Sequence, residues 1–315
     1  ANLISAFTGI TSHTGGFIIS DTGTVLASAL NTINTLTSGT TTATEPGRIT
    51  GTAAEVVATI DATSLSSDLT LVITGVDAAT IDELKTINKA TSGTVVVNAG
   101  TDAAAYTDTV ANLAAAFDGI TSHTGGLSVS DTGTVLAADL TNISNLTSGT
   151  TTAITPPHVT GSSAEIVSAI GVVILSPNVT LSIAGNAATI DDLKTVNGAT
   201  SGVVVLNTAT NAAAYTDTAA NFAAAFDAIT TLTATLTITG SAATIAELKT
   251  INAATSGAVV LNPETNATAY TDTAANLISA FTGVTSHLGG LTISDTGPVS
   301  ASELDIINTL KAAGV

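Results

Sequence analysis

The chain has 315 residues and a formal net charge of −18, with only six lysines and arginines. So few basic residues exclude a nucleic-acid surface, which needs clusters of Lys and Arg to neutralise phosphates. The absence of cysteine excludes disulfides and thiol chemistry. No apolar run approaches the ~20 residues of a membrane-spanning helix, and a hydrophobic content of 44% is enough to build a buried core.

An internal repeat organises the whole sequence. Its anchor is an Asp or Gly that follows a short apolar segment, and short and long spacings between anchors alternate along the chain. A longer period returns Ala1-Asn2-Leu3 as Ala111-Asn112-Leu113. Such periods are typical of solenoids, in which each coil packs on its neighbours. The eleven anchors are Asp21, Gly51, Gly75, Asp108, Asp131, Gly161, Gly185, Asp217, Gly240, Asp272 and Asp295.

The predicted elements begin, in chain order, with a helix-like segment at Asn2–Phe7. Two residues before each anchor stands an apolar residue or Tyr, usually followed by Ser or Thr, and this alternation predicts a short half-buried strand. After the anchor, apolar residues recur at helical spacing, as at Leu26, Leu30 and Ile33. Extra apolar residues at 95–97 and 203–206 predict a second short strand in the longer coils.

Capping signals mark both ends of the predicted helices. A Ser or Thr followed three residues later by Glu predicts a capping box at the start of a helix. Glycines close most coils and suit a helix C-cap. The capping boxes are Thr52–Glu55, Thr80–Glu83, Ser162–Glu165, Thr244–Glu247 and Ser300–Glu303, and the closing glycines include Gly39, Gly93, Gly149, Gly202 and Gly257.

These patterns predict an α/β repeat protein: a right-handed β/α solenoid of about eleven coils, because strand–helix–strand crossovers are nearly always right-handed. A parallel sheet of short strands is expected on one side and one helix per coil on the other. We expect one array over residues 1–315, with super-repeats at about 1–110, 111–219 and a shortened 220–315. Residues 1–10 nearly repeat 275–284, so both ends look like interior coils and further coils are expected to stack there.

The pattern Ser-Asp-Thr-x-x-x-Leu-Ala-x-x-Leu at Ser130–Leu140 and Tyr-Thr-Asp-Thr-Ala-Ala-Asn-Leu at Tyr270–Leu277 resemble the Ser-Asp-Thr-Ala-Ala-Asn repeats of very large secreted bacterial surface proteins. Such proteins occur in cyanobacteria and proteobacteria and are often described as calcium-binding, hemolysin-like or S-layer-like. The resemblance implies an extracellular, cell-surface location. The Gly-Gly-x-Gly-x-Asp nonapeptide of calcium β-rolls is absent from this chain.

Two sets of side chains are candidates for metal binding. The anchors Asp108, Asp131, Asp272 and Asp295 fall in adjacent coils and are candidate Ca²⁺ ligands, since calcium takes several carboxylate oxygens. The competing interpretation is that each Asp caps the helix that follows it. His13, His123 and His287 recur in Thr-Ser-His-x-Gly-Gly turns and are expected to be exposed turn residues.

A row of hydroxyl side chains is the candidate ligand face. The Ser or Thr before each anchor is expected on the outer face of the sheet, where a regular row fits ice or a glycan. The competing interpretation is that Thr is simply a good strand residue. The row consists of Thr50, Thr74, Thr107, Ser130, Thr160, Thr216, Thr239 and Thr271.

No catalytic motif is present: the sequence has no Gly-x-Ser-x-Gly elbow, phosphate loop or His-Glu-x-x-His. We therefore expect no enzyme and no cofactor, with Ca²⁺ as the one candidate ion. The predicted function is a structural or adhesive repeat segment of a bacterial surface assembly, such as a filament, S-layer or giant adhesin, that stacks head-to-tail on other copies or further repeats. The alternative is a module that binds ice or glycan through the hydroxyl row. A cell surface or glycan is a candidate partner, and no membrane insertion is expected.

Overall fold

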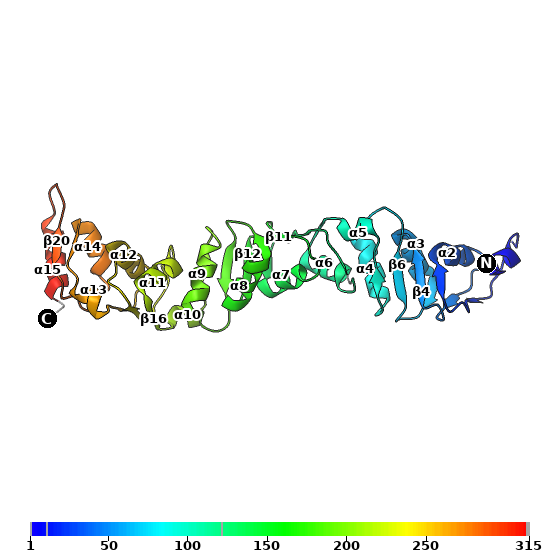
Figure 1. Ribbon diagram of the computed structural model, residues 1–315, viewed down its shortest axis with the longest axis horizontal. Helices are drawn as coiled ribbons and strands as arrows, with labels where there is room; N and C mark the ends of the chain where they lie inside the picture. Colours follow the sequence, from blue (N-terminus) through cyan, green and yellow to red (C-terminus); the bar gives the residue numbers. More distant parts are fainter. Residues whose placement is uncertain (1, 11, 121, 313–315) are drawn as a thin grey trace. The chain divides into compact units, whose positions relative to one another are not determined.

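A computed structural model describes residues 2–10, 12–120 and 122–312 of the chain. It is an α/β protein in which short parallel strands alternate with helices (Figure 1). Contacts divide it into two compact units, which are described separately. Unit 1 comprises residues of Ala1–Val135, Asp139–Pro156 and Val172–Leu175, and unit 2 comprises residues of Leu136–Ala138, Pro157–Gly171 and Ser176–Val315.

The helices are short, and three of them have only five residues. Their bounds are α1 (Asn2–Phe7), α2 (Ala27–Thr35), α3 (Ala53–Ala62), α4 (Ile81–Ala90), α5 (Ala99–Ala103), α6 (Val110–Phe117), α7 (Ala137–Ser144), α8 (Ser163–Val172), α9 (Ile190–Gly198), α10 (Thr208–Ala212), α11 (Ala219–Phe226), α12 (Ile245–Ala254), α13 (Pro263–Ala267), α14 (Ala274–Phe281) and α15 (Ala301–Ala312).

The strands contain two to four residues each. Their bounds are β1 (Phe17–Ile18), β2 (Thr24–Leu26), β3 (Thr41–Ala43), β4 (Arg48–Gly51), β5 (Thr63–Leu65), β6 (Thr70–Ile73), β7 (Val95–Val96), β8 (Tyr106–Asp108), β9 (Leu127–Val129), β10 (Thr134–Leu136), β11 (Thr151–Ala153), β12 (His158–Gly161), β13 (Val173–Leu175), β14 (Thr180–Ile183), β15 (Val204–Val205), β16 (Tyr215–Thr218), β17 (Leu236–Thr239), β18 (Val259–Val260), β19 (Tyr270–Asp272) and β20 (Leu291–Ile293).

Several sheets replace the single sheet that the sequence predicts. Unit 1 holds the sheets β1-β3-β5, β2-β4-β6-β7 and β13-β11-β9-β8, and unit 2 holds β12-β14-β15, β16-β17-β18 and β19-β20. Strands such as β3 and β5 were not predicted, because the triplets Thr-Thr-Ala and Thr-Ser-Leu are too short and too polar to carry a clear strand signal. The extra apolar segments at 95–97 and 203–206 are confirmed as strands, β7 and β15. They do not form a separate row, because β7 pairs with β6 and β15 pairs with β14.

The strand register differs from the spacing of the anchors. Each strand pairing advances along the chain by about the short anchor spacing, so the long spacings do not correspond to one coil. Asp108 pairs with Val129, two residues before the anchor Asp131. Gly51 likewise pairs with Ile73 rather than with the next anchor. The anchors therefore mark similar local sequences, not equivalent positions in a ladder.

The capping boxes are confirmed. Thr52 accepts a hydrogen bond from the backbone N–H of Glu55, and the Glu55 carboxylate accepts one from the N–H of Thr52. This reciprocal pair satisfies two donors that the first turn of a helix leaves free. The same two bonds form in the other boxes, which are Thr80–Glu83, Ser162–Glu165, Thr244–Glu247 and Ser300–Glu303.

The closing glycines have a different role from the predicted C-caps. None of Gly39, Gly93, Gly149, Gly202 and Gly257 has the positive φ of a left-handed cap. They allow the backbones of adjacent coils to approach: a Cβ on Gly39 would lie 2.7 Å from the carbonyl oxygen of Thr14. The positive φ occurs instead at other glycines, among them the anchors Gly75, Gly185 and Gly240.

A threonine two residues before each closing glycine links its turn to the preceding coil. The Thr91 hydroxyl donates to the carbonyl oxygen of Leu69 at 2.6 Å and accepts from the N–H of Gly93 at 2.9 Å. One hydroxyl therefore holds a carbonyl of one coil and an amide of the next. We call this arrangement the Thr bridge. It recurs at Thr37, Thr147, Thr200 and Thr255.

The helices are linked along their stack by lysine and asparagine side chains. Lys85 on α4 donates to the side-chain oxygen of Asn112 on α6 at 2.8 Å. Asn88, one turn further along α4, donates to the carbonyl oxygen of Ala115 at 3.0 Å. The same pair of contacts joins α9 to α11 and α12 to α14, through Lys194, Asn197, Lys249 and Asn252. Beneath these links the core is aliphatic, with residues such as Leu84 and Leu113 fully buried.

Candidate functional site

Hydroxyl side chains do form rows on the exposed faces of the sheets. In the sheet β13-β11-β9-β8, the register places Thr107, Ser128, Thr152 and Ile174 side by side, and the residues flanking each of them on its strand are mostly buried. The hydroxyl of Thr152 donates to that of Ser128 at 2.8 Å. Part of this row therefore satisfies its own hydrogen bonds.

The eight residues predicted as one row do not lie together in register. Thr50 pairs with Val72, Thr160 with Ser182, and Thr107 with Ser128. Thr216 pairs with Thr237, and Thr271 with Thr292. The other three predicted members are Thr74, Ser130 and Thr239. Each lies two residues after the residue that actually pairs with the preceding member of the row, namely Val72, Ser128 and Thr237. The prediction of a single row is wrong because it followed the anchors, whose spacing is not the register.

Aliphatic side chains interrupt the hydroxyl face in one sheet of unit 1. The register of β2-β4-β6-β7 aligns Leu26, Thr50, Val72 and Val96. Leu26 is exposed and Val72 is buried. This row combines one hydroxyl with aliphatic groups. It therefore presents a mixed surface and not a uniform hydroxyl ladder.

The four predicted calcium ligands lie at helix N-termini. The carboxylate of Asp108 accepts from the N–H of Thr109 and from the side-chain amide of Asn112, both at 2.7 Å. Asp131, on the next coil, accepts from the N–H of Val110 at 2.8 Å. Two carboxylates from adjacent coils thus meet the first turn of α6, where helix dipoles favour negative charge.

The second pair repeats this geometry at α14. Asp272 accepts from the N–H of Thr273 and the side chain of Asn276, and Asp295 accepts from the N–H of Ala274. The hydrogen bond from Asn276 and then that from Thr273 lower the pKa of Asp272. Within the described parts of the chain, no three His, Asp or Glu side chains are grouped so as to hold a metal ion. The contacts support the capping interpretation of these aspartates.

Replacing Asp131 with alanine is expected to destabilise unit 1 by about 1 kcal/mol, the usual net contribution of one hydrogen bond. The amide of Val110 then loses its carboxylate partner. Urea unfolding followed by circular dichroism measures the change. Asp77→Ala, at an exposed bend of the same unit, is the control and should change the midpoint little. If D131A is also neutral, the contact contributes nothing to stability.

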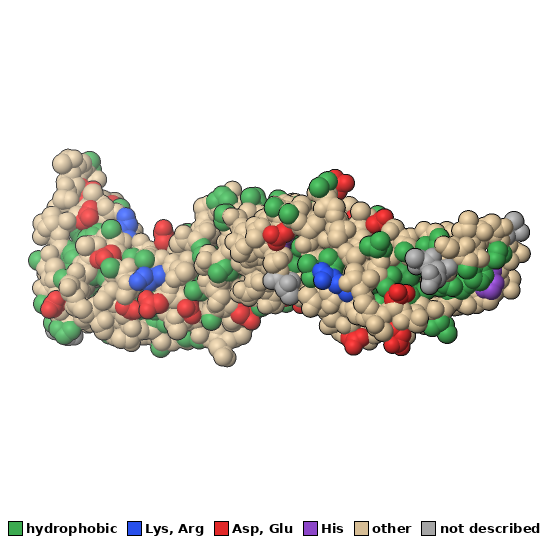
Figure 2. Space-filling view, turned by 45° about the vertical axis from the view of Figure 1, so that its right-hand side comes forward, with side chains coloured by type: hydrophobic (Ala, Val, Ile, Leu, Met, Phe, Trp, Pro, Cys, Tyr) green, Lys and Arg blue, Asp and Glu red, His purple; other side chains and the backbone are tan. Residues whose placement is uncertain are grey.

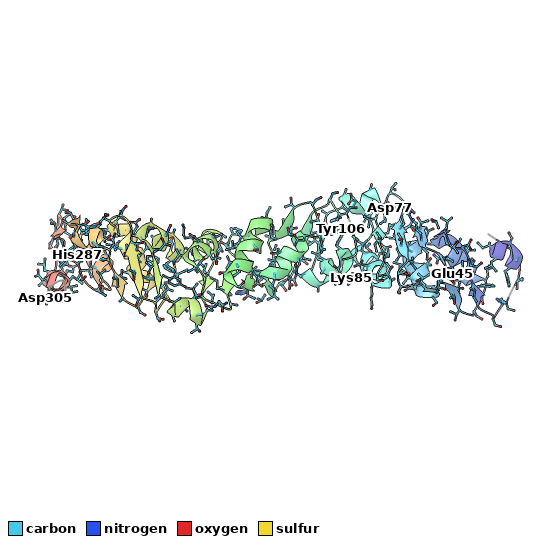
Figure 3. The ribbon with its side chains drawn as sticks, turned by 60° about the horizontal axis from the view of Figure 1, so that its bottom comes forward. Glu45, Asp77, Lys85, Tyr106, His287 and Asp305 are labelled. Atoms are coloured by element: carbon cyan, nitrogen blue, oxygen red, sulfur yellow. The ribbon has the colours of Figure 1, made fainter. Side chains whose placement is uncertain are left out.

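Two of the three turn histidines are buried, which corrects the prediction that they are exposed, and His13 is half-buried. His123 and His287 are each only 4% exposed. The His123 ring centroid lies 4.5 Å from that of Phe117, and the His287 ring centroid 4.6 Å from that of Phe281. The loop folds back because the imidazole completes an aromatic cluster that each Phe begins. Figure 3 shows His287 within the packed side chains of its unit.

Burial lowers the pKa of both His123 and His287, although the nearby Asp102 acts in the opposite direction on His123. The folded state therefore binds fewer protons than the unfolded state as the pH falls below the ordinary value of 6.5. The contribution of these two histidines to the free energy of unfolding is therefore expected in full above that pH. It declines at lower pH, because acid protonates the two histidines more readily in the unfolded chain than in the folded one.

This pH dependence can be measured from urea midpoints at pH 7.5 and 5.0. In the double variant His123→Gln/His287→Gln, the difference between the two midpoints should shrink. The exposed His158→Gln is the control and should retain the full difference. An unchanged difference in the double variant would contradict the assignment.

The three tyrosines lie in the core. Burial raises the pKa of Tyr106, Tyr215 and Tyr270, so these phenols stay protonated. Acidic side chains are scattered over the face seen in Figure 2 rather than gathered at one place. None of the described helices is long and apolar enough to cross a lipid bilayer.

Comparison with protein-family models gives no match for this chain, and comparison with curated proteins gives none either.

Proposed function

We propose that this chain is a non-catalytic structural or adhesive repeat segment of an extracellular bacterial surface assembly, such as a filament, an S-layer or a giant adhesin. In this proposal the coils form a right-handed β/α solenoid. Their length follows the step of the strand register, which replaces the count of eleven coils taken from the anchors. The resemblance of Ser130–Leu140 and Tyr270–Leu277 to secreted surface repeats motivates the extracellular location.

The observation that carries the proposal is the recurrence of coil-to-coil bonds. The Thr bridge occurs at five turns, and the Lys–Asn link joins three pairs of helices. The repeated side chains thus connect each coil to the next and do not converge on one reaction centre. In a repeat array, such nearest-neighbour interfaces supply the stability.

Assembly in solution tests the structural proposal. The chain is expected to form species larger than a monomer as concentration rises, measured by sedimentation velocity and seen by negative-stain electron microscopy. Leu304 and Ile306 are exposed apolar side chains on α15, and Leu304→Asp/Ile306→Asp should weaken self-association. Val76→Asp, at an exposed turn, is the control. A chain that stays monomeric at every concentration and adheres to no cell-wall preparation overturns the proposal.

The alternative is a module that binds ice or glycan through the hydroxyl rows, and the alignment of Thr107, Ser128 and Thr152 favours it. Ice binding predicts thermal hysteresis in solution. Thr107→Tyr and Thr152→Tyr should abolish the hysteresis, because a bulky ring breaks the flat row. Thr155→Tyr, in a loop between β11 and β12, is the control. Absence of hysteresis removes the ice-binding alternative.

A further inference from the structure

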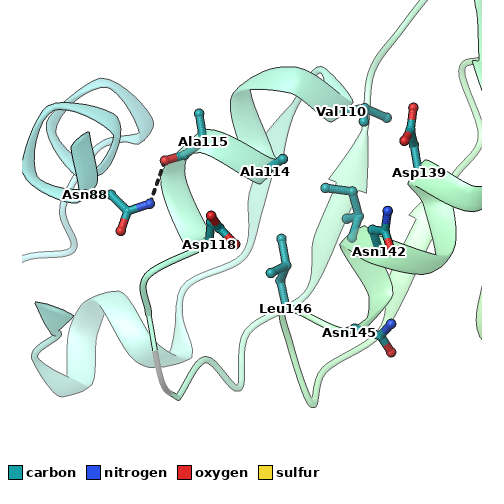
Figure 4. A pocket seen from close by; sticks show the side chains of 10 residues that line it. Asn88, Val110, Ala114, Ala115, Asp118, Asp139, Asn142, Asn145 and Leu146 are labelled. Atoms are coloured by element: carbon teal, nitrogen blue, oxygen red, sulfur yellow. Dashed lines mark hydrogen bonds between the residues drawn. The ribbon is translucent and has the colours of Figure 1, made fainter. Parts of the chain in front are cut away.

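A cavity of about 570 Å³ opens in unit 1 between the end of α6 and α7. Asp118 stands on one side, and Asp139 and Asn142 stand on the other (Figure 4). Ala114 and Leu146 line it with apolar surface, and Asn145 adds a fourth polar side chain. The volume lies within the range of about 300–1,000 Å³ that is typical of small-molecule sites.

The polar side chains of this cavity are available to a ligand. Asn88, at its edge, is occupied, because its amide donates to the carbonyl oxygen of Ala115. No hydrogen bond of the described residues engages the side chains of Asp118, Asp139, Asn142 or Asn145. Two carboxylates that only accept hydrogen bonds therefore face the same space as two carboxamides that both donate and accept.

The cavity lies where the second copy of the repeat differs most from the first. Residues 111–160 align with residues 1–50 without a gap. Of the eight cavity residues that have a counterpart there, six differ, whereas only 11 of the other 42 aligned residues differ. Ile4 becomes Ala114, which opens space, and Thr8 and Ala29 become Asp118 and Asp139. Sites with a function are where a regular pattern is expected to break.

A second cavity continues the first. It measures about 420 Å³, shares the walls Asn145 and Leu146, and is lined by hydroxyls such as those of Ser122, Thr147 and Ser148. The counterpart in residues 1–50 keeps this hydroxyl-lined part at about 320 Å³. The acidic and amide groups of the first cavity are specific to residues 111–160 in this pair of copies, because Thr8, Ala29, Thr32 and Thr35 stand at their positions in residues 1–50.

The chemistry of the lining selects the ligand class. The walls carry two carboxylates and no basic side chain, and the chain has a net charge of −18, so anions are repelled. A metal ion would need several oxygen ligands at one point, and no such group exists among the described residues. Carboxylates, carboxamides and hydroxyls along an aliphatic floor match a chain of neutral rings that presents hydroxyls at its edges and C–H groups on its faces.

We propose that these two joined cavities bind a neutral oligosaccharide, with its rings on Ala114 and Leu146 and its hydroxyls on Asp118, Asp139, Asn142 and Asn145. This site lies apart from the sheet faces and does not depend on self-assembly. It goes beyond the proposed function by naming a ligand and the residues that hold it.

Isothermal titration calorimetry with cellohexaose, hexa-N-acetylchitohexaose and maltohexaose tests the proposal. At least one of these should bind the full chain with a Kd below about 1 mM, and hexagalacturonic acid should not. Ala114→Ile restores the residue found at Ile4 in the first copy of the repeat, which aligns without a gap, so the fold should persist while the cavity fills. Affinity should fall at least tenfold in A114I and in Asp118→Thr/Asp139→Ala. Ala138→Ser, which restores Ser28 on the same helix outside the cavity, should bind as the unmodified chain does.

The proposal is overturned if no neutral hexasaccharide binds, or if binding persists in an A114I variant whose thermal unfolding is unchanged. Equal binding of the acidic hexasaccharide also overturns it. Sedimentation of the same A114I sample tests the proposed structural function independently of oligosaccharide binding. The filled cavity should leave self-association unchanged, so a failure of one proposal can be told from a failure of the other.

Discussion

Replacing Phe117 with alanine is expected to lower the free energy of unfolding of unit 1 by about 3–5 kcal/mol. Phe117 is fully buried, and its ring centroid lies 5.1 Å from that of Tyr106 and 4.5 Å from that of His123. Alanine removes the ring at the centre of this cluster, and the cavity that remains is lined by groups fixed in adjacent coils. Urea unfolding monitored by circular dichroism gives the change.

The chain offers both a replicate and a control for this change. Phe281→Ala should have a similar effect in unit 2, because Phe281 packs in the same way on Tyr270 and His287. Ile18→Ala removes an exposed side chain and should stay within about 0.5 kcal/mol of the unmodified chain. A loss below about 1 kcal/mol for F117A, at the low end for core truncations, would mean that the cluster is not part of the stable core.

The second large effect is expected at a closing glycine. In Gly93→Ala, the new methyl group would overlap the carbonyl oxygens of Asp68 and Leu69 in the preceding coil. Backbone atoms cannot swing aside as a side chain does, so the coils must separate and the Thr91 bridge must lengthen. Overpacking of this kind costs about 1–3 kcal/mol. Melting temperatures by differential scanning calorimetry measure the loss.

Gly23→Ala is the matched control, because nothing lies within 4 Å of the position of its added methyl group. It should leave the melting temperature close to that of the unmodified chain. Equal losses in G93A and G23A would show that the effect belongs to glycine flexibility in general and not to the contact between coils.

Local signals in the sequence were sufficient for the helices that follow the anchors, whereas the five-residue helices α5, α10 and α13 were not predicted. The Thr52–Glu55 and Thr80–Glu83 boxes start α3 and α4 because a capping box involves only residues three apart. The spacing of Leu30 and Ile33 likewise fixes the buried face of α2. These features depend on neighbours in the chain, so a single sequence contains the information that they need.

The register and the hydroxyl rows depend on contacts between coils. The predictions for them were wrong because they rested on local sequence similarity. Asp108 and Asp131 occupy similar local sequences, yet the ladder aligns Asp108 with Val129. The burial of His123 also depends on Phe117 and Tyr106 from other segments. The cavity at Asp118 was not predicted either. A signal for it was present in the sequence, because Ala114 stands where the first copy of the repeat has Ile4.

The Thr bridges have a consequence for how each unit responds to tension. Each bridge joins only one coil to the next, so a pull on the chain ends strains them in series, and coils should detach one at a time. A detached coil releases the chain between two register partners, such as Arg48 and Thr70, which is roughly 73–79 Å when extended at about 3.3–3.6 Å per residue. Single-molecule stretching of either unit would then give a sawtooth of evenly spaced force peaks, the behaviour of a tether that dissipates energy in small steps.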